Sequence, residues 1–217
     1  MNYADLSTAI QAYCENNFPD SQGMVSATQI ATFVREAEQR IYNNVQILAL
    51  RKNVTGTTTN GIKYLAVPSD WLANFSLSLT DPVTGAFSFL LNKDVNFIRE
   101  SFPFPAVTGA PTHYAMFDNT SYILGPTPDN TYTMELHYFY YPPSIVTAGT
   151  SWVGDNFDSV LLYGSLLEAA AFMKSDADVI TQYQKRYDEA LALLTELAEG
   201  KNRQDMYRTQ QIRFPVR

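Results

Sequence analysis

The sequence THYAMFDNTSYILGPTPDNTYTMELHYFYYPP, residues 112–143, carries the strongest strand pattern in the chain. Between Tyr132 and Tyr140 every second residue is apolar or aromatic, and three of the four residues in between are polar. A period of two predicts a β-strand with one buried face and one wet face. Pro142 and Pro143 end this strand, because proline has no amide proton to donate to a neighbouring strand.

Two shorter runs precede that strand, residues 112–117 and 121–124, with Asp118 and Asn119 between them. Asp and Asn tolerate the backbone angles of a tight turn, so the two runs predict a hairpin. Residues 125–130, GPTPDN, predict a second turn. A β-meander is the simplest arrangement for this stretch. Upstream, the runs 62–67, 75–79 and 86–91 predict further strands, and residues 92–102 a short helix or an irregular crossover.

Helical patterns lie on both sides of this β region. Apolar residues recur at helical spacing in residues 3–15, in a helix that starts at a capping box at residues 26–29, in a third helix ending near residue 174, and in residues 175–200. We expect Asn156 or Asp158 to cap the third helix and Gly200 to end the fourth. Gly164 weakens the third helix by ~1 kcal/mol relative to Ala, and a close helix crossing is the usual compensation. The residues expected to face inward in the first three helices are Leu6, Ile10, Tyr13, Ile30, Phe33, Val34, Ala37, Ile41, Val45, Phe157, Leu161, Leu167, Ala171 and Phe172.

Together these patterns predict an α+β fold, with a four-helix bundle, an inserted antiparallel β-sandwich or meander region and an extended C-terminal arm. Neither helical pair alone has an apolar face broad enough for a domain, so residues 1–50 and 150–200 are expected to form the bundle together. Residues 51–149 would be the inserted β region, beginning with a polar boundary at 51–61. Residues 201–217 would be the arm.

Charge is unevenly distributed along the 217 residues. The net charge is −7, but residues 201–217 carry +4, which leaves −11 for residues 1–200. An acidic body argues against a nucleic-acid-binding protein, whose body is basic. A basic tail suits contact with a partner, and a solvated terminus is the alternative. No apolar run approaches ~20 residues and no signal-peptide pattern is present, so we expect synthesis in the cytoplasm and no membrane association.

Few residues have the character of catalytic or metal-binding groups, so we expect no enzyme, no cofactor and no metal site. The two histidines, His113 and His137, fit a turn and the wet face of a strand. Cys14 is the single cysteine, and no histidine, cysteine and carboxylate spacing resembles a zinc site. No glycine-rich phosphate loop, G-x-S-x-G or H-E-x-x-H motif occurs. A pair of carboxylates that meets only in the folded chain is the enzymatic alternative.

Aromatic residues are abundant, with 14 tyrosines and 13 phenylalanines. The run YFYY at residues 138–141 exceeds what one buried strand face requires. We therefore expect both faces of this strand to be covered, one by the sandwich and the other by helices or a neighbouring subunit. Carbohydrate binding is an alternative use of exposed aromatic side chains on a β-sandwich.

Several motifs, in this order along the chain, resemble one known family. Residues 64–71, YLAVPSDW, are similar to the opening of the family's β region. Residues 109–114, GAPTHY, are similar to its Gly-x-Pro-x-x-Tyr entry, and residues 123–140 are similar to its central hairpin. Residues 161–172 and 183–187 resemble its paired C-terminal helices. Over about residues 26–200 the chain thus resembles the head-to-tail adaptor proteins of tailed bacteriophages, also called head-completion or tail-connector proteins.

The resemblance implies a structural virion protein without catalysis, made in the host cytoplasm and located at the head-to-tail interface. It implies a homo-oligomeric ring, expected to be a dodecamer, that binds the portal protein and extends the DNA channel. Genomic DNA would pass through without specific binding, and the ring would be the attachment platform for a tail or nozzle protein. A stopper or tail-terminator protein of the same assembly is the main alternative, and a carbohydrate-binding virion module is another.

In the family that the chain resembles, a C-terminal arm lies along the portal, and residues 201–217 match it in character. The arginines of this segment recur at intervals of five, five and four residues, which fits neither a helix face nor strand alternation, so an extended arm is expected. Arginine binds carboxylates in a bidentate manner, and Phe214 and Val216 would be apolar anchors. The predicted portal-binding residues are Tyr207, Arg208, Ile212, Arg213, Phe214, Pro215, Val216 and Arg217.

Overall fold

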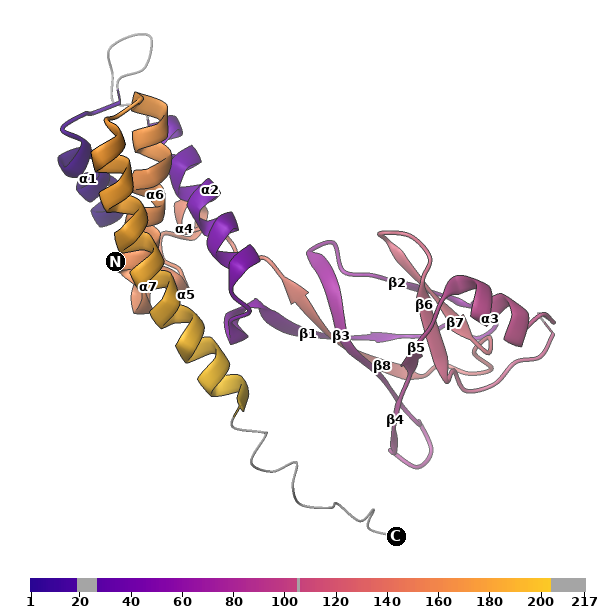
Figure 1. The fold of residues 1–217 in the computed structure, drawn as a ribbon. Coiled ribbons are helices and arrows are strands. Elements are labelled where there is room, and N and C mark those ends of the chain that lie inside the picture. Colours follow the sequence, from indigo (N-terminus) through magenta and orange to yellow (C-terminus); the bar gives the residue numbers. More distant parts are fainter. Residues whose placement is uncertain (19–26, 105, 204–217) are drawn as a thin grey trace. The chain divides into compact units, whose positions relative to one another are not determined.

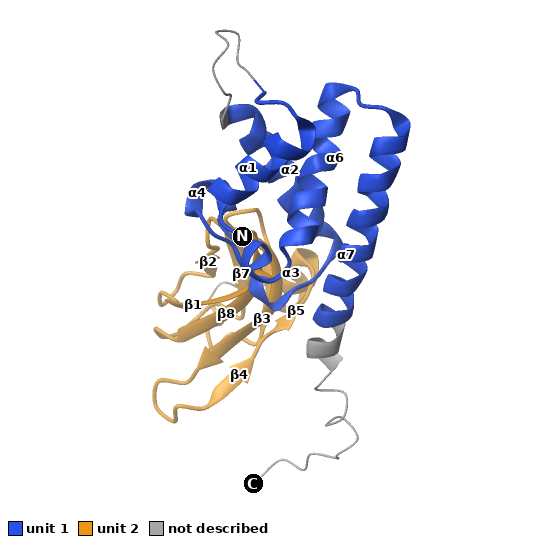
Figure 2. Ribbon diagram, turned by 90° about the vertical axis from the view of Figure 1, so that its left-hand side faces the viewer, with its two compact units in different colours: residues 1–49, 142–217 blue, residues 50–141 orange. Residues whose placement is uncertain are grey.

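The computed structural model of the chain describes residues 1–18, 27–104 and 106–203. It divides into two compact units, shown in separate colours in Figure 2. Residues 1–49 and 142–217 form a helical unit, and residues 50–141 form a β unit. The α+β class predicted from the sequence is confirmed. Residues 142–149, which the sequence analysis assigned to the β region, belong to the helical unit, because they contain a short helix that contacts α2.

The helical unit is built around α6, Asp158–Met173 (Figure 1). This helix contacts α1, α2, α5 and α7, and successive buried residues cover every side of it. It therefore lacks the single apolar stripe of a surface helix. Its lone buried hydroxyl, on Ser165, donates to the carbonyl oxygen of Leu161 at 2.7 Å. The other helices of the unit are α1, Tyr3–Cys14; α2, Ala27–Asn44; α4, Ile145–Ala148; α5, Trp152–Asn156; and α7, Ala177–Arg203.

The amphipathic pattern of α2 is confirmed, because all six residues of its predicted inward stripe are buried. One carboxylate, that of Glu38, is buried with them and is 4% exposed. It accepts a hydrogen bond of 2.9 Å from the backbone N–H of Ile145, at the start of α4, and the Ser144 side chain bonds to it as well. Glu38 therefore links two segments that are separated by the whole β unit in the sequence.

Gly164 marks a close helix crossing, as its position inside a helix predicted. A Cβ atom at this position would lie 3.2 Å from the Cβ of Ala37 on α2 and 3.2 Å from the ring of Tyr187 on α7. Both neighbours are buried. The missing side chain thus lets three helices approach one another, which offsets the low helix propensity of glycine.

Four details of the helices differ from the prediction. Tyr13 is 51% exposed, because Leu6 and Ile10 alone form the buried side of α1. Ala171 and Phe172 at the end of α6 are both exposed, Phe172 by 56%, although its ring lies 5.4 Å from that of Phe33. The N-cap of α6 is Phe157, which makes no side-chain capping bond, since α5 ends directly before it. Gly200 does not end α7, which continues to Arg203.

The β unit contains two four-stranded sheets, preceded by the short 3-10 helix η1, Leu48–Leu50. One sheet has the order β1-β8-β3-β4 and is antiparallel throughout. The other has the order β2-β7-β6-β5, with a parallel pair between β5 and β6. The strands are β1, Arg51–Thr57; β2, Tyr64–Ala66; β3, Trp71–Thr80; β4, Phe87–Phe89; β5, Leu91–Asn92; β6, His113–Met116; β7, Ser121–Gly125; and β8, Thr133–Tyr140.

The stretch that dominates the sequence pattern supplies strands to both sheets. The predicted hairpin is present as β6 and β7, and the half-buried strand as β8, with Met134, Leu136 and Tyr138 on its buried side. The predicted meander is wrong, because β8 does not pair with β7 but lies between β1 and β3 in the other sheet. The expected polar boundary at 51–61 is wrong as well, since residues 51–57 form β1, a strand exposed along its whole length.

Aromatic side chains fill the core between the strands. Tyr114, Tyr122, Tyr132 and Tyr138 are buried there with leucines of β3 and β8. Their hydroxyls have partners, as buried phenols require. The hydroxyl of Tyr138, for example, donates to Asp70 at 2.8 Å. A second cluster lies under α3, Val95–Ser101, where Ile98 packs on Ala115 and Ile123.

Candidate partner-binding site

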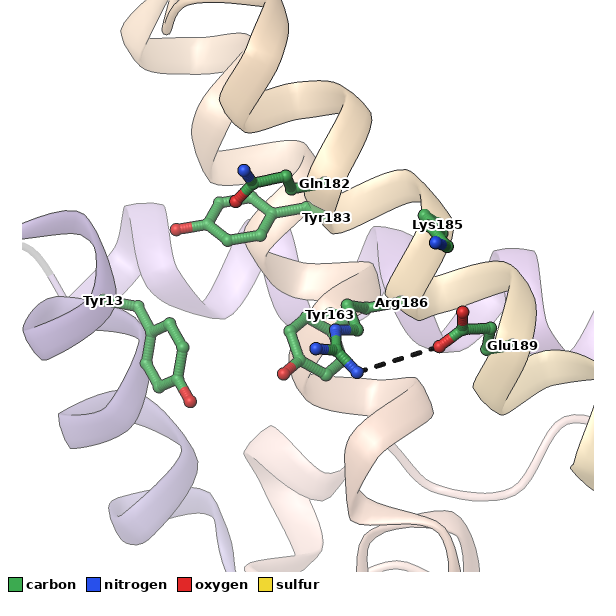
Figure 3. A pocket seen from close by; sticks show the side chains of 7 residues that line it. All are labelled: Tyr13, Tyr163, Gln182, Tyr183, Lys185, Arg186 and Glu189. Carbon is green, nitrogen blue, oxygen red and sulfur yellow. Dashed lines mark ion pairs between the residues drawn. The ribbon is translucent and has the colours of Figure 1, made fainter.

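A hollow of about 500 Å³ opens on the helical unit where α1, α6 and α7 meet (Figure 3). Tyr13 comes from α1, Tyr163 from α6, and Tyr183 and Arg186 from α7. The remaining lining residues, Gln182, Lys185 and Glu189, also belong to α7. Tyr13 and Tyr183 reach the hollow from two helices because α1 and α7 both pack on α6.

The side chains of this hollow are better suited to binding a partner than to covalent catalysis. The rings of Tyr163 and Tyr183 are 6.4 Å apart between centroids, and Arg186 and Glu189 form a loose ion pair of 3.8 Å. Burial raises the pKa of Tyr183, with smaller contributions from Cys14 and Tyr13. Burial also raises the pKa of the Cys14 thiol to about 11, so the thiol is protonated and a poor nucleophile at neutral pH. Phenolic hydroxyls, a guanidinium and a carboxylate can form hydrogen bonds to a partner chain.

A second hollow, of about 360 Å³, continues the first one along α7. The two share Tyr163, Arg186 and Glu189, so they form one groove. In this second part, Leu193 on the wall of the groove is 63% exposed. Aromatic and apolar walls with a few charged groups are typical of protein interfaces. This groove was not predicted from the sequence, because it depends on three helices meeting.

The outer face of the sheet β1-β8-β3-β4 is the second candidate surface. The guanidinium of Arg51 lies 4.8 Å from the ring centre of Phe75 and 5.7 Å from that of Phe139. At the edge of the same face, Phe87 is 63% exposed and Phe89 is 73% exposed. Within the β unit one face of β8 is buried and the other is partly exposed, so cover of that second face by a neighbouring subunit stays a prediction.

A charged pair fixes the start of this sheet. The ammonium of Lys52 donates to Asp70 at 2.7 Å, and the hydroxyl of Tyr138 donates to the other oxygen of the same carboxylate. These two hydrogen bonds, from Lys52 first, hold the pKa of Asp70 below its usual value. The same partner raises the pKa of Lys52. Both groups thus stay charged near neutral pH and tie β1 to the turn before β3.

Neither histidine lies in a catalytic arrangement. Nε2 of His137 lies 3.1 Å from Glu135 on the exposed face of β8, as expected for a surface histidine. Nδ1 of His113 lies 2.8 Å from the hydroxyl of Thr112, and its ring packs near Phe97 and Phe102. Across residues 1–18, 27–104 and 106–203, no group of three or more histidine, cysteine, aspartate or glutamate side chains is placed to hold a metal ion.

The predicted portal-binding residues cannot be placed. Residues 204–217 lie outside the described part of the chain. They include Tyr207, Arg208, Ile212, Arg213, Phe214, Pro215, Val216 and Arg217.

Comparison with known protein families gives one match. A family model described as SU10 adaptor protein matches residues 1–213. The chain belongs to the SU10 adaptor protein family. This membership confirms the resemblance to phage adaptors and supports a structural role in a bacteriophage particle. No curated protein matches the chain. Among the described residues of this adaptor, no helix is long and apolar enough to cross a membrane.

Proposed function

We propose that this SU10-family adaptor forms a ring, of twelve copies, beneath the portal of a tailed bacteriophage. The ring extends the DNA channel, and the tail or nozzle protein attaches to it. The observation that carries this proposal is the family match over residues 1–213. The proposal includes the finer architecture, in which α1, α2, α6 and α7 act as a four-helix bundle and residues 50–141 as a sandwich-like insertion.

The charge distribution supports a channel role. Residues 1–200 carry a net charge of −11. A DNA duplex slides past a surface of the same sign, because neither phosphate contacts nor counterion release hold it there. An adaptor of this charge passes the genome without binding a particular sequence.

The residues after α7, 204–217, act in this proposal as the arm that binds the portal, three residues shorter than the 201–217 expected from the sequence because α7 ends at Arg203. Arginines are suited to the carboxylates of a partner, and Phe214 and Val216 supply apolar anchors. The groove along α7 and the aromatic face of the β unit are then available to other copies and to the tail.

Native mass spectrometry tests the proposed ring. The purified adaptor is measured alone, then after mixing with purified portal rings from the same phage. We expect one adaptor per portal subunit in the complex, twelve in total. A complex of six copies would point to a stopper or tail terminator, and the absence of any complex would contradict the proposal.

A further inference from the structure

The sheet β1-β8-β3-β4 ends in two exposed strands. Every residue of β1 is exposed, and so is every residue of β4. Within the described residues, no strand pairs with the outer side of either one. Proteins usually protect such edges, because unpaired backbone groups are a template for another strand. β1 contains no proline and no bulge, and five of its seven residues are uncharged.

The hydrogen bonds show which backbone groups face outward. The N–H of Thr58 bonds to Tyr132, just before β8, so alternate residues of β1 point to β8, and Thr55 and Thr57 point away from it. On β4, the N–H of Leu90 bonds to Leu77, so the N–H and C=O groups of Phe87 and Phe89 point to the other free edge.

The residues of the two edge strands, β1 and β4, are also in register with each other across the sheet. Thr55 lies opposite Glu135, Glu135 opposite Ser78, and Ser78 opposite Phe89. The next open row joins Thr57, by way of Thr133 and Thr80, to Phe87. Residues that are paired across the sheet have their side chains on the same face. At both free edges, these residues therefore point their backbone N–H and C=O groups away from the sheet and carry their side chains on its exposed face.

We propose that β4 of one copy pairs with β1 of the next copy, with Phe89 opposite Thr55 and Phe87 opposite Thr57. The four strands of the sheet alternate in direction, so β1 and β4 of one copy run in opposite directions. When copies are related by rotation about the ring axis, β4 of one copy therefore lies antiparallel to β1 of the next, as in the rest of the sheet. Each contact makes Phe–Thr pairs, an aromatic and a β-branched residue, which stabilise antiparallel strands. Such a head-to-tail contact uses different surfaces on the two partners and closes into a ring.

This inference rests on the proposed ring and adds its lateral contact. A four-stranded sheet is about 19 Å wide, so twelve sheets joined edge to edge, with strands along the ring axis, enclose a circle about 70 Å across. The contact involves only a short stretch of backbone, so the portal is expected to template it.

Disulfide cross-linking tests the register. In a Cys14→Ser background, Thr55→Cys is combined with Phe89→Cys, and mild oxidant is added to the free protein at high concentration and to the portal complex. The two cysteines of one copy are three strand spacings, about 14 Å, apart, too far for a bridge within the copy. We expect a ladder of covalent multimers on a non-reducing gel. The control pair, Asn53→Cys with Phe89→Cys, is shifted by two residues and is expected to form few.

Thr55→Pro tests the edge without cysteines. Its N–H points away from β8, so proline removes an outward donor and leaves the ladder within the copy intact. We expect an unchanged melting temperature and at least a tenfold loss of adaptor–adaptor association on the portal. If adaptors bind the portal but neither cysteine pair cross-links, the proposed contact between β4 and β1 is wrong, while the proposed ring is not contradicted. If adaptors never bind the portal, the proposed function fails, and the ladder from free protein alone decides the edge contact.

Discussion

At the scale of single residues, Glu38 shows how one buried carboxylate joins two distant parts of the helical unit. It is 4% exposed and accepts the N–H of Ile145. Burial raises its pKa, against smaller lowering effects of Ser144, Ile145 and Arg35. A raised pKa in the folded state means that Glu38 favours folding most below its unfolded pKa, and that this contribution is lost as the pH rises through the folded value.

The first prediction separates the charge of Glu38 from its hydrogen bond. Glu38→Gln keeps an acceptor oxygen but cannot ionise, so its stability relative to wild type should increase between pH 4 and pH 7. Glu38→Ala cannot ionise either, but it leaves the N–H of Ile145 buried without an acceptor, so it should be about 1–3 kcal/mol less stable than Glu38→Gln at all pH values. Urea unfolding at several pH values measures both. Equal pH dependence of wild type and Glu38→Gln would show that Glu38 does not titrate as described.

A second prediction concerns Gly164. Leucine at this position has to fit where a Cβ is already 3.2 Å from Ala37 and Tyr187, so Gly164→Leu should lower the free energy of unfolding by about 1–3 kcal/mol through overpacking. Ser159→Leu, at an exposed position of the same helix, is the control and should stay within about 0.5 kcal/mol of wild type. A stable Gly164→Leu variant would mean that α2 and α7 move apart easily.

At the scale of elements, the β unit leaves and re-enters the helical unit through neighbouring backbone. Arg51 at the start of β1 pairs with Phe139 near the end of β8. A short linker can therefore replace residues 50–141. We expect this deletion variant to remain helical by circular dichroism, because α6 keeps its contacts with α1, α2, α5 and α7. A variant joined from Leu50 to Thr150 also loses α4 and should melt at a lower temperature. An unfolded product from the first deletion would contradict two separable units.

The C-terminal arm gives a second element-scale prediction. Deleting residues 207–217 should leave the melting temperature within about 2 °C of wild type, because α7 and its contacts precede them. The same deletion should abolish co-purification with the portal. Arg213→Ala combined with Phe214→Ala should weaken attachment severely, while the matched pair Gln210→Ala and Gln211→Ala should not. A truncated adaptor that still binds the portal at full stoichiometry would place docking on the helical unit.

Local pattern predicted the elements better than it predicted their partners. The period of two in residues 132–140 and the helical stripe of α2 identified a strand and a helix, because burial on one face imposes these periods. β1 was not predicted, because both of its faces are exposed and its sequence therefore shows no alternation of apolar and polar residues. The change of sheet between β7 and β8 follows from long-range pairing, which no local pattern encodes. The groove of Tyr13, Tyr163 and Tyr183 was missed for the same reason, since it combines side chains from three helices.

For the whole molecule, the acidic body, the open-edged sheet and the basic C-terminal segment all fit one role in an assembly. The two open edges of the sheet, β1 and β4, can each pair with a further strand. In a ring, β4 of one copy lies beside β1 of the next. A weak lateral contact keeps the free adaptor from assembling before it meets the portal. Stable rings in the absence of portal would mean that the lateral contact is stronger than its few backbone pairs indicate.

Electron cryomicroscopy of the virion vertex would show the proposed ring itself. We expect a ring of twelve copies of this chain in contact with the portal, around the DNA channel. A portal vertex that lacks the protein, or a copy found only at the far end of the tail, would contradict the account.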